Sequence, residues 1–212
     1  MRVYLNFRKL WEVNMGIRKS TGPDATQLVE TALTEIQDAT NILSPLGGEE
    51  RAMEPEELLE PLPVYSVGLE ELAGHELRPN LQPTSWRYLI WQGNEPVGTA
   101  DVDADELIEE DSLAAFNHVS RGAPARLLNQ ALLLAEEEFE HSDEQFDLRI
   151  LEIPALNRVA LWLQSQDRQL FIPYIRPDLL TSDQPPRIEP DFLDALPDIS
   201  DQTPDKGTPT EQ

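Results

Sequence analysis

The sequence contains no cysteine, which excludes thiol catalysis, disulfide bonds and cysteine metal sites. Lysine is nearly absent as well, with only Lys9, Lys19 and Lys206 in 212 residues. No run approaches the roughly 18 consecutive apolar residues that a transmembrane helix needs. Near the N-terminus, Asn6 and Arg8 interrupt the apolar residues, so the uninterrupted apolar region of a secretory signal is missing. We therefore expect a cytoplasmic protein that does not enter a membrane.

Nucleotide-binding and hydrolase signatures are also missing. The sequence has no G-x-G-x-x-G loop, no phosphate-binding P-loop and no G-x-S-x-G nucleophile motif. Its three histidines, His75, His118 and His141, are never three or four residues apart, so they form no local metal-binding pair. We predict no metal, no cofactor and no catalytic residues. A non-enzymatic protein is favoured, although catalytic residues scattered along the chain would leave no such signature.

Acidic charge is the dominant feature that is present. The chain has 40 Asp and Glu residues against 16 Lys and Arg, a net charge of −24. Such a charge repels the phosphates of nucleic acid and the surface of anionic membranes. It attracts basic partners, and it also keeps a chain soluble. The charge therefore predicts no nucleic-acid or membrane partner, and it predicts that a protein partner would be basic.

Charge and proline content divide the chain into five parts. These are a basic N-terminal extension (1–23), an amphipathic helix (24–48), an acidic linker (49–61), an α+β core domain (62–180) and an acidic, proline-rich tail (181–212). The linker and the tail are rich in charge and proline, so we expect the linker to be mobile and the tail to be disordered. The exception within the tail is one short amphipathic turn formed by Phe192, Leu193, Leu196 and Ile199. The sequence leaves open whether Met1 or Met15 is the first residue of the protein.

Residues 24–43 have apolar side chains at helical spacing. Asp24 and Gln27 resemble a capping box, and apolar residues then recur every three or four positions as far as Leu43. The stripe is shorter than three heptads, which is too short for a free-standing coiled coil. We expect this helix to pack either on its own domain or on a second copy, so a homodimer through residues 24–43 is one predicted partner.

The core alternates strand-like and helix-like segments. Strand-like runs occupy 63–67, 86–91, 97–103, 148–153, 159–163 and 170–175, and a helix occupies 124–141. Residues 157–164, which include the run at 159–163, would also suit a short helix. Gly93 and Asn94 separate the second and third runs, which predicts a β-hairpin. The order predicts an α+β fold: a small antiparallel sheet of about five to six strands, covered by one or two helices and flanked by disordered acidic tails.

One segment carries a family resemblance. Residues 147–174, DLRILEIPALNRVALWLQSQDRQLFIPY, with WRYLIW upstream, are similar to uncharacterised bacterial proteins with an IPAL-x-x-x-ALWL core segment. The resemblance covers roughly half of the chain and implies no known activity. In element order alone, the core resembles profilin-like or roadblock domains and, less closely, type III secretion chaperones, which are also acidic.

Asp101, Asp103 and Asp105 alternate with small apolar residues. Closely spaced carboxylates can bind a hard cation. An EF-hand loop, however, needs Gly at its sixth position and Glu at its twelfth, where this sequence has Glu106 and Ser112. In a strand, alternation places the aspartates on one face and the apolar residues on the other. We interpret the aspartates as the solvated face of an edge strand, with weak cation binding as the alternative.

The segment before the 124–141 helix is locally basic. His118, Arg121 and Arg126 lie around the start of this helix. Free N–H groups and the helix dipole attract anions there, and arginine offers paired hydrogen-bond donors. If the protein has a small-ligand site, these three residues are its predicted binding residues. The alternative is that the two arginines pair with neighbouring carboxylates.

Two functions remain after this survey. The first is a non-enzymatic, acidic protein-binding or adaptor module that holds a basic partner. The alternative is a small enzyme or an anion-binding domain that uses the helix N-terminus near residues 118–126. The sequence names neither a partner nor a substrate nor a pathway.

Overall fold

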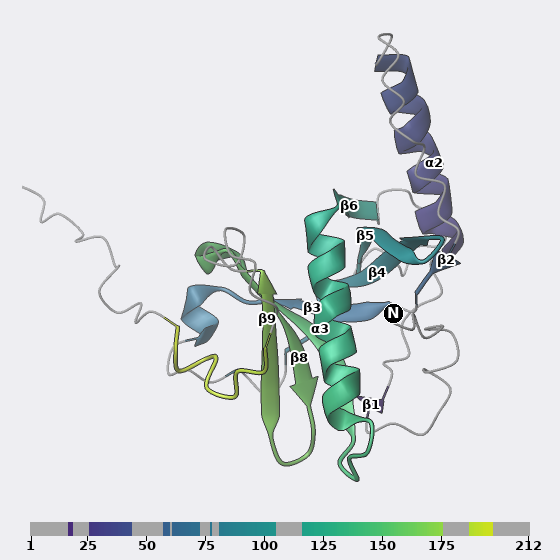
Figure 1. The fold of residues 1–212 in the computed structure, drawn as a ribbon. Coiled ribbons are helices and arrows are strands. Elements are labelled where there is room, and N and C mark those ends of the chain that lie inside the picture. Colours follow the sequence, from purple (N-terminus) through teal and green to yellow (C-terminus); the bar gives the residue numbers. More distant parts are fainter. Residues whose placement is uncertain are drawn as a thin grey trace, which may run out of the picture.

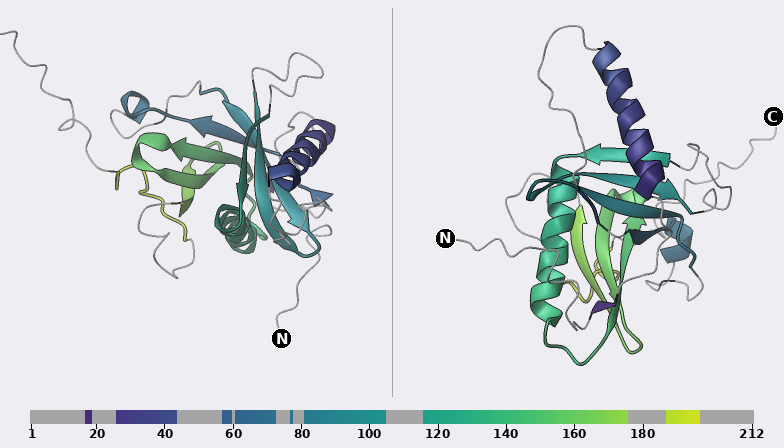
Figure 2. Two further views of the ribbon diagram at one scale, coloured as in Figure 1. Left: turned by 90° about the horizontal axis from the view of Figure 1, so that it is seen from above. Right: turned by 90° about the vertical axis from the view of Figure 1, so that its right-hand side faces the viewer.

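The computed structural model describes residues 17–18, 26–43, 57–59, 61–72, 77, 81–104, 116–175 and 187–196. These residues form a β-sheet that curls around one helix, with a second helix on the outer face of the sheet (Figures 1 and 2). The predicted α+β class is confirmed. Within the described part of the chain, no helix is long and apolar enough to span a bilayer.

Seven strands form a continuous sheet in the order β6-β5-β4-β3-β7-β8-β9, while β1 adds to β7 and β2 adds to β4. The strands are β1 (Ile17–Arg18), β2 (Glu57–Leu58), β3 (Leu62–Ser66), β4 (Ser85–Gln92), β5 (Glu95–Asp103), β6 (Phe116–Arg121), β7 (Phe146–Ile153), β8 (Arg158–Gln164) and β9 (Gln169–Ile175). The helices are α2 (Thr26–Leu43) and α3 (Ala123–Phe139), with 3-10 turns η1 (Leu69–Leu72) and η4 (Pro154–Leu156). The six predicted strands correspond to β3, β4, β5, β7, β8 and β9, so the run at 159–163 is a strand.

The sheet is mixed, and the predicted antiparallel sheet of about five to six strands is wrong in pairing and in extent. Strand β7 runs parallel to β3 and to β1, whereas the other neighbours are antiparallel. Between β3 and β7 the chain forms β4, β5, β6 and α3, and then returns to the free side of β3. The pairing of β7 with β3 cannot be predicted locally, because the residue pattern of a strand does not identify the strand that it pairs with.

The inner, concave face of the sheet packs against α3 (Figure 2). Leu128, Leu132, Ala135 and Phe139 recur on one side of α3 and are buried against apolar side chains of β3, β7, β8 and β9. Full burial of one such large side chain contributes about 1.5–3 kcal/mol. The helix begins after Gly122, whose φ of 78° lies in the region that favours glycine.

Two separate elements cover the outer face. Val29 and Leu33 of α2 pack on apolar residues of β4 and β5, so the described part of α2 packs on its own domain, and the predicted homodimer stays a prediction. The β7-β8-β9 half is covered by residues 187–196, where the Phe192 ring centroid lies 5.4 Å from that of Phe171. Residues 187–196, which include most of the expected short amphipathic turn, therefore pack on the sheet.

Other sequence predictions fall mainly outside the described residues. This applies to most of the basic extension (1–23), to the first part of the acidic linker (49–61), to the end of the tail and to the acidic run 105–111. Within the linker, the described residues Glu57–Leu58 form β2, which pairs with β4.

Phe192→Ala tests the packing of the C-terminal segment. The substitution should lower the free energy of unfolding by about 3 kcal/mol, because a buried ring is removed from an aromatic cluster. Chemical denaturation measures the loss. Asp194 is exposed on the same segment, and Asp194→Ala should stay within about 0.5 kcal/mol of the wild type. Equal stability of Phe192→Ala and the wild type would contradict the packing.

Glu136 occupies an unfavourable position near the C-terminal end of α3. Its Oε1 is buried and has no hydrogen-bond partner among the described residues. Burial, together with the charge of Glu140, raises the pKa of the Glu136 carboxyl. A raised pKa in the folded state means that the ionised form is penalised there. Glu136 therefore destabilises the fold at neutral pH, and this effect fades as the pH falls through the raised pKa to below the ordinary value.

Glu136→Gln should consequently raise the melting temperature at pH 7. Removal of the repulsion from Glu140 alone contributes about 0.2–0.5 kcal/mol, and the advantage should vanish near roughly pH 4, where glutamate is protonated in any case. Thermal melts across this pH range give the comparison, with Glu138→Gln as an exposed control on the same helix. An advantage that persists or grows on acidification would contradict the assignment.

Candidate functional site

On the concave face, strands β7 and β3 change from apolar to polar in the same direction. Strand β7 presents three buried apolar residues to α3 and then Glu152. Strand β3 presents two buried apolar residues to α3 and then Ser66, which is the register partner of Glu152. Because side chains two positions apart share a face, both polar residues face the concave side, beyond the apolar core.

A row of charged and polar side chains crosses the neighbouring strands at this level. Arg87 of β4 is the register partner of Asp101 of β5, and Asp101 is the register partner of His118 of β6. One step along, Thr99 of β5 is paired with Ser120 of β6. Cross-strand partners on one face lie within contact distance of each other, so the register itself assembles a polar cluster.

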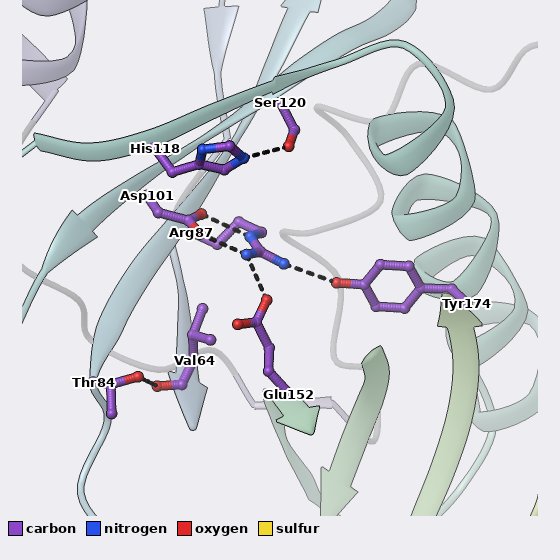
Figure 3. A network of polar contacts seen from close by, with 8 residues as sticks. All are labelled: Val64, Thr84, Arg87, Asp101, His118, Ser120, Glu152 and Tyr174. Carbon is purple, nitrogen blue, oxygen red and sulfur yellow. Dashed lines mark hydrogen bonds and ion pairs between the residues drawn. The ribbon is translucent and has the colours of Figure 1, made fainter. Parts of the chain in front are cut away.

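Arg87 lies at the centre of this cluster (Figure 3). Its Nε donates to Asp101 Oδ1 at 2.7 Å and its Nη2 donates to Asp101 Oδ2 at 2.5 Å, a bidentate ion pair. Nη2 also donates to Glu152 Oε1 at 2.7 Å. Nη1 donates to the Tyr174 hydroxyl at 3.2 Å. The four residues come from β4, β5, β7 and β9.

The cluster is largely removed from water. Arg87 is 9% exposed, Asp101 7% and Tyr174 1%. Burial would lower the pKa of Arg87, but Tyr174 and the two carboxylates raise it well above its usual value. Burial raises the pKa of Tyr174 to about 12, against the opposing effect of Arg87. At neutral pH the site therefore holds a charged guanidinium and a neutral phenol.

The cluster forms one wall of a cavity of about 540 Å³. Six lining residues carry hydroxyl groups: Ser66, Thr84, Ser85, Thr99, Ser120 and Tyr174. Asp103 and His118 also line it, and its apolar lining residues are Pro124 and Ile175. The volume falls within the range of about 300–1,000 Å³ that small-molecule sites occupy. The lining is more polar than in most such sites, so a ligand that fits would itself be polar.

β-Bulges interrupt two strands beside the cavity. On β9, Tyr174 is the extra residue between the register partners of Val159 and Ala160. On β6, Asn117 is the extra residue beside His118. A bulge bends its strand and changes the direction of nearby side chains, and bulges are frequent next to functional sites. Both irregularities occur where a side chain lines the cavity.

The structure brings one of the three predicted site residues to this cavity. His118 lines it, and His118 Nε2 lies 2.8 Å from Ser120 Oγ. Arg121, at the end of β6, and Arg126, in the first turns of α3, are exposed and are not among the lining residues. The predicted trio therefore does not form one cluster around the cavity.

The start of α3 offers little to an anion. The Gly122 N–H donates to the Val97 carbonyl at 3.0 Å, and the Arg126 N–H donates to the Gly122 carbonyl at 3.3 Å. The α3 residue that lines the cavity is Pro124, which has no N–H group. An anion in the cavity would find no backbone donor at this residue.

The interpretation of the aspartates as the solvated face of an edge strand is wrong for Asp101. Strand β5 lies between β4 and β6, and Asp101 is buried and paired with Arg87. The predicted alternation is correct, because Ala100 and Val102 face α2. Asp105 lies outside the described residues. Across the described ranges, no group of three or more His, Asp or Glu side chains could hold a metal ion.

Sequence reasoning missed Arg87, Glu152 and Tyr174. A signal was present for the first two, since each is a charged residue inside a strongly apolar strand. Such a residue on a covered face must be paired. The sequence did not show that both faces of these strands are covered, so the charges could equally have faced water.

One pair of side chains at the cavity has the spacing of a reactive pair. His118 and Ser120 lie within hydrogen-bond reach, as a base and a nucleophile do, but the contacts described for His118 include no carboxylate that would orient its ring. Asp101, its cross-strand neighbour, is engaged by Arg87. No family model, curated protein or solved structure matches this chain.

Arg87→Met tests whether the cluster is buried. The variant leaves Asp101 and Glu152 without their cation, and the free energy of unfolding should fall by about 3–5 kcal/mol. Arg126→Met removes an exposed cation and should cost about 0–1 kcal/mol. Denaturant unfolding of both variants provides the measurement. If Arg87→Met lowers the free energy of unfolding as little as Arg126→Met does, water screens the ion pairs of Arg87.

Proposed function

We propose that this protein is a non-enzymatic binding module whose ligand site is the cavity on the concave face of the sheet. The observation that carries the proposal is the position of the Arg87 cluster, which lines an open cavity and is not enclosed by the apolar core. Buried ion pairs of this kind add little net stability compared with apolar side chains of similar size. A charged cluster at a cavity is instead typical of a ligand-binding site.

The proposed protein class, a non-enzymatic binding module, is the one expected from the sequence, but the proposed binding site differs from the expected one. The expected anion site was the helix N-terminus with Arg121 and Arg126, whereas the cavity lies between the strands that carry Arg87, Asp101 and Glu152. A small molecule and a side chain of a partner protein are both compatible with an open cavity of this size. The net charge of −24 supports a basic partner through long-range attraction.

A thermal-shift screen with a cavity-filling variant tests this proposal. Cationic, anionic, zwitterionic and neutral polar compounds are added to the wild type and to Ser120→Trp, which places a large ring in the cavity. At least one compound class should raise the melting temperature of the wild type in a concentration-dependent manner, since a ligand that binds only the folded state stabilises it. Ser120→Trp should not respond to that class.

Two controls make the screen specific to the cavity. Thr34 is exposed on α2, so Thr34→Trp adds the same bulk elsewhere and should respond like the wild type. Arg126→Ala should also respond like the wild type, because Arg126 does not line the cavity. No response from any class, or an equal response from Ser120→Trp, would place the function elsewhere.

A further inference from the structure

We infer that the cavity recognises a cationic nitrogen group, an ammonium or a guanidinium, that Glu152 and the neighbouring hydroxyl oxygens receive. This inference rests on the proposed function and names the ligand class of the same site. The group belongs either to a free amine or guanidine or to a Lys or Arg side chain of a partner protein, and the two sources share the chemistry.

The charge balance of the cluster favours a cation. One guanidinium, that of Arg87, serves two carboxylates, those of Asp101 and Glu152. The three groups together keep one net negative charge at the cavity, where Glu152 is the more exposed of the two carboxylates. A bound cation would neutralise it, whereas a bound anion would add to it.

The geometry of Glu152 also favours a cation. Its Oε1 accepts from Arg87 Nη2, and its other carboxylate oxygen is turned away from the guanidinium (Figure 3). The Glu152 side chain is 25% exposed, compared with 10% for that of Asp101. Both carboxylate oxygens of Asp101 accept hydrogen bonds from Arg87. Glu152 is therefore the more exposed carboxylate of this pair, with one oxygen directed away from Arg87.

The hydroxyl groups beside Glu152 supply further acceptors. Ser66 is the register partner of Glu152 and shares the cavity with it. Thr84 donates its hydroxyl hydrogen to the Val64 carbonyl at 3.2 Å (Figure 3), so the Thr84 oxygen presents lone pairs. A hydroxyl oxygen has two such acceptor sites. Carboxylate and hydroxyl oxygens together match the several N–H donors of an ammonium or guanidinium.

An anion would find poorer partners in the same cavity. Arg87 already donates to Asp101, Glu152 and Tyr174, so an anion would have to displace a carboxylate from it. The α3 residue at the cavity, Pro124, offers no N–H group. Neither of the usual anion ligands, a spare arginine or a helix N-terminus, is open to the cavity among the described residues.

The experiment compares matched probes by calorimetry and by chemical-shift mapping at fixed low salt. Nα-acetyl-arginine methylamide is compared with Nα-acetyl-citrulline methylamide, which has nearly the same shape but no charge. Butylguanidine represents the free small molecule, and acetate and phosphate represent anions. The proteins are the wild type, Glu152→Gln, Ser120→Trp and Glu138→Gln. Glu138 is exposed on α3, about 21 Å along the helix from Pro124 at 1.5 Å per residue.

The arginine probe should bind the wild type at least tenfold more tightly than the citrulline probe. Glu152→Gln keeps the Arg87–Asp101 pair and should weaken the arginine probe at least tenfold, while Glu138→Gln should change it by less than about twofold. Ser120→Trp should abolish binding. Tighter binding of the acetylated arginine than of butylguanidine would indicate a protein side chain as the natural source, and the reverse would indicate a small molecule.

The failure of this inference is distinct from the failure of the proposed function. If acetate, phosphate or citrulline binds the wild type as tightly as the arginine probe and Ser120→Trp abolishes that binding, the cavity is a binding site and the cation assignment is wrong. An unchanged affinity in Glu152→Gln overturns the assignment as well, provided that the variant melts cooperatively like the wild type. If nothing binds in a manner sensitive to Ser120→Trp, both fail.

Discussion

The contact of Arg87 with residues of distant strands depends on the curl of the sheet and helps to hold it. Strands β4 and β9 are four places apart in the sheet order, a separation of about 19 Å in a flat sheet. Arg87 Nη1 and the Tyr174 hydroxyl are nevertheless 3.2 Å apart. Together with the pairs to Asp101 and Glu152, this contact joins the β6-β5-β4 half to the β7-β8-β9 half across the concave side. Among the described residues, Arg87 and Asp101 are the only buried charged ones.

The apolar pattern of the sequence was sufficient to locate most elements, for a physical reason. Strands that are covered on both faces read as apolar runs, and both long helices carry apolar residues at helical spacing. Strand β6 was missed because FNHVSR has little of either pattern: its concave positions, His118 and Ser120, line a polar cavity. The same feature that makes this strand part of the site removed the signal by which it could have been recognised.

The site was less predictable than the fold, because it depends on register and on crossover. The alternation of Asp101 with Ala100 and Val102 was read correctly, but which face meets water is decided by α2 and α3, which are distant in sequence. Glu152 joins Arg87 only because β7 returns beside β3 in parallel. Local spacing carries no information about that return. His118 was predicted as a site residue because it lies next to a helix start. Its cross-strand pairing with Asp101 could not be inferred from that position in the sequence.

The position of the cavity follows from where α3 begins. Strand β6 ends at Arg121, and Gly122, with φ of 78°, lets the chain turn directly into the helix. The helix then runs over the apolar part of the concave face, where its side chains are buried, and its first turn reaches the edge of the polar part at Pro124. Beyond Pro124 the polar row, with Arg87, Asp101 and Glu152, lines the cavity. The conformation of one glycine, permitted because it lacks a Cβ atom, thus separates a packed core from an open, charged cavity on the same face of one sheet.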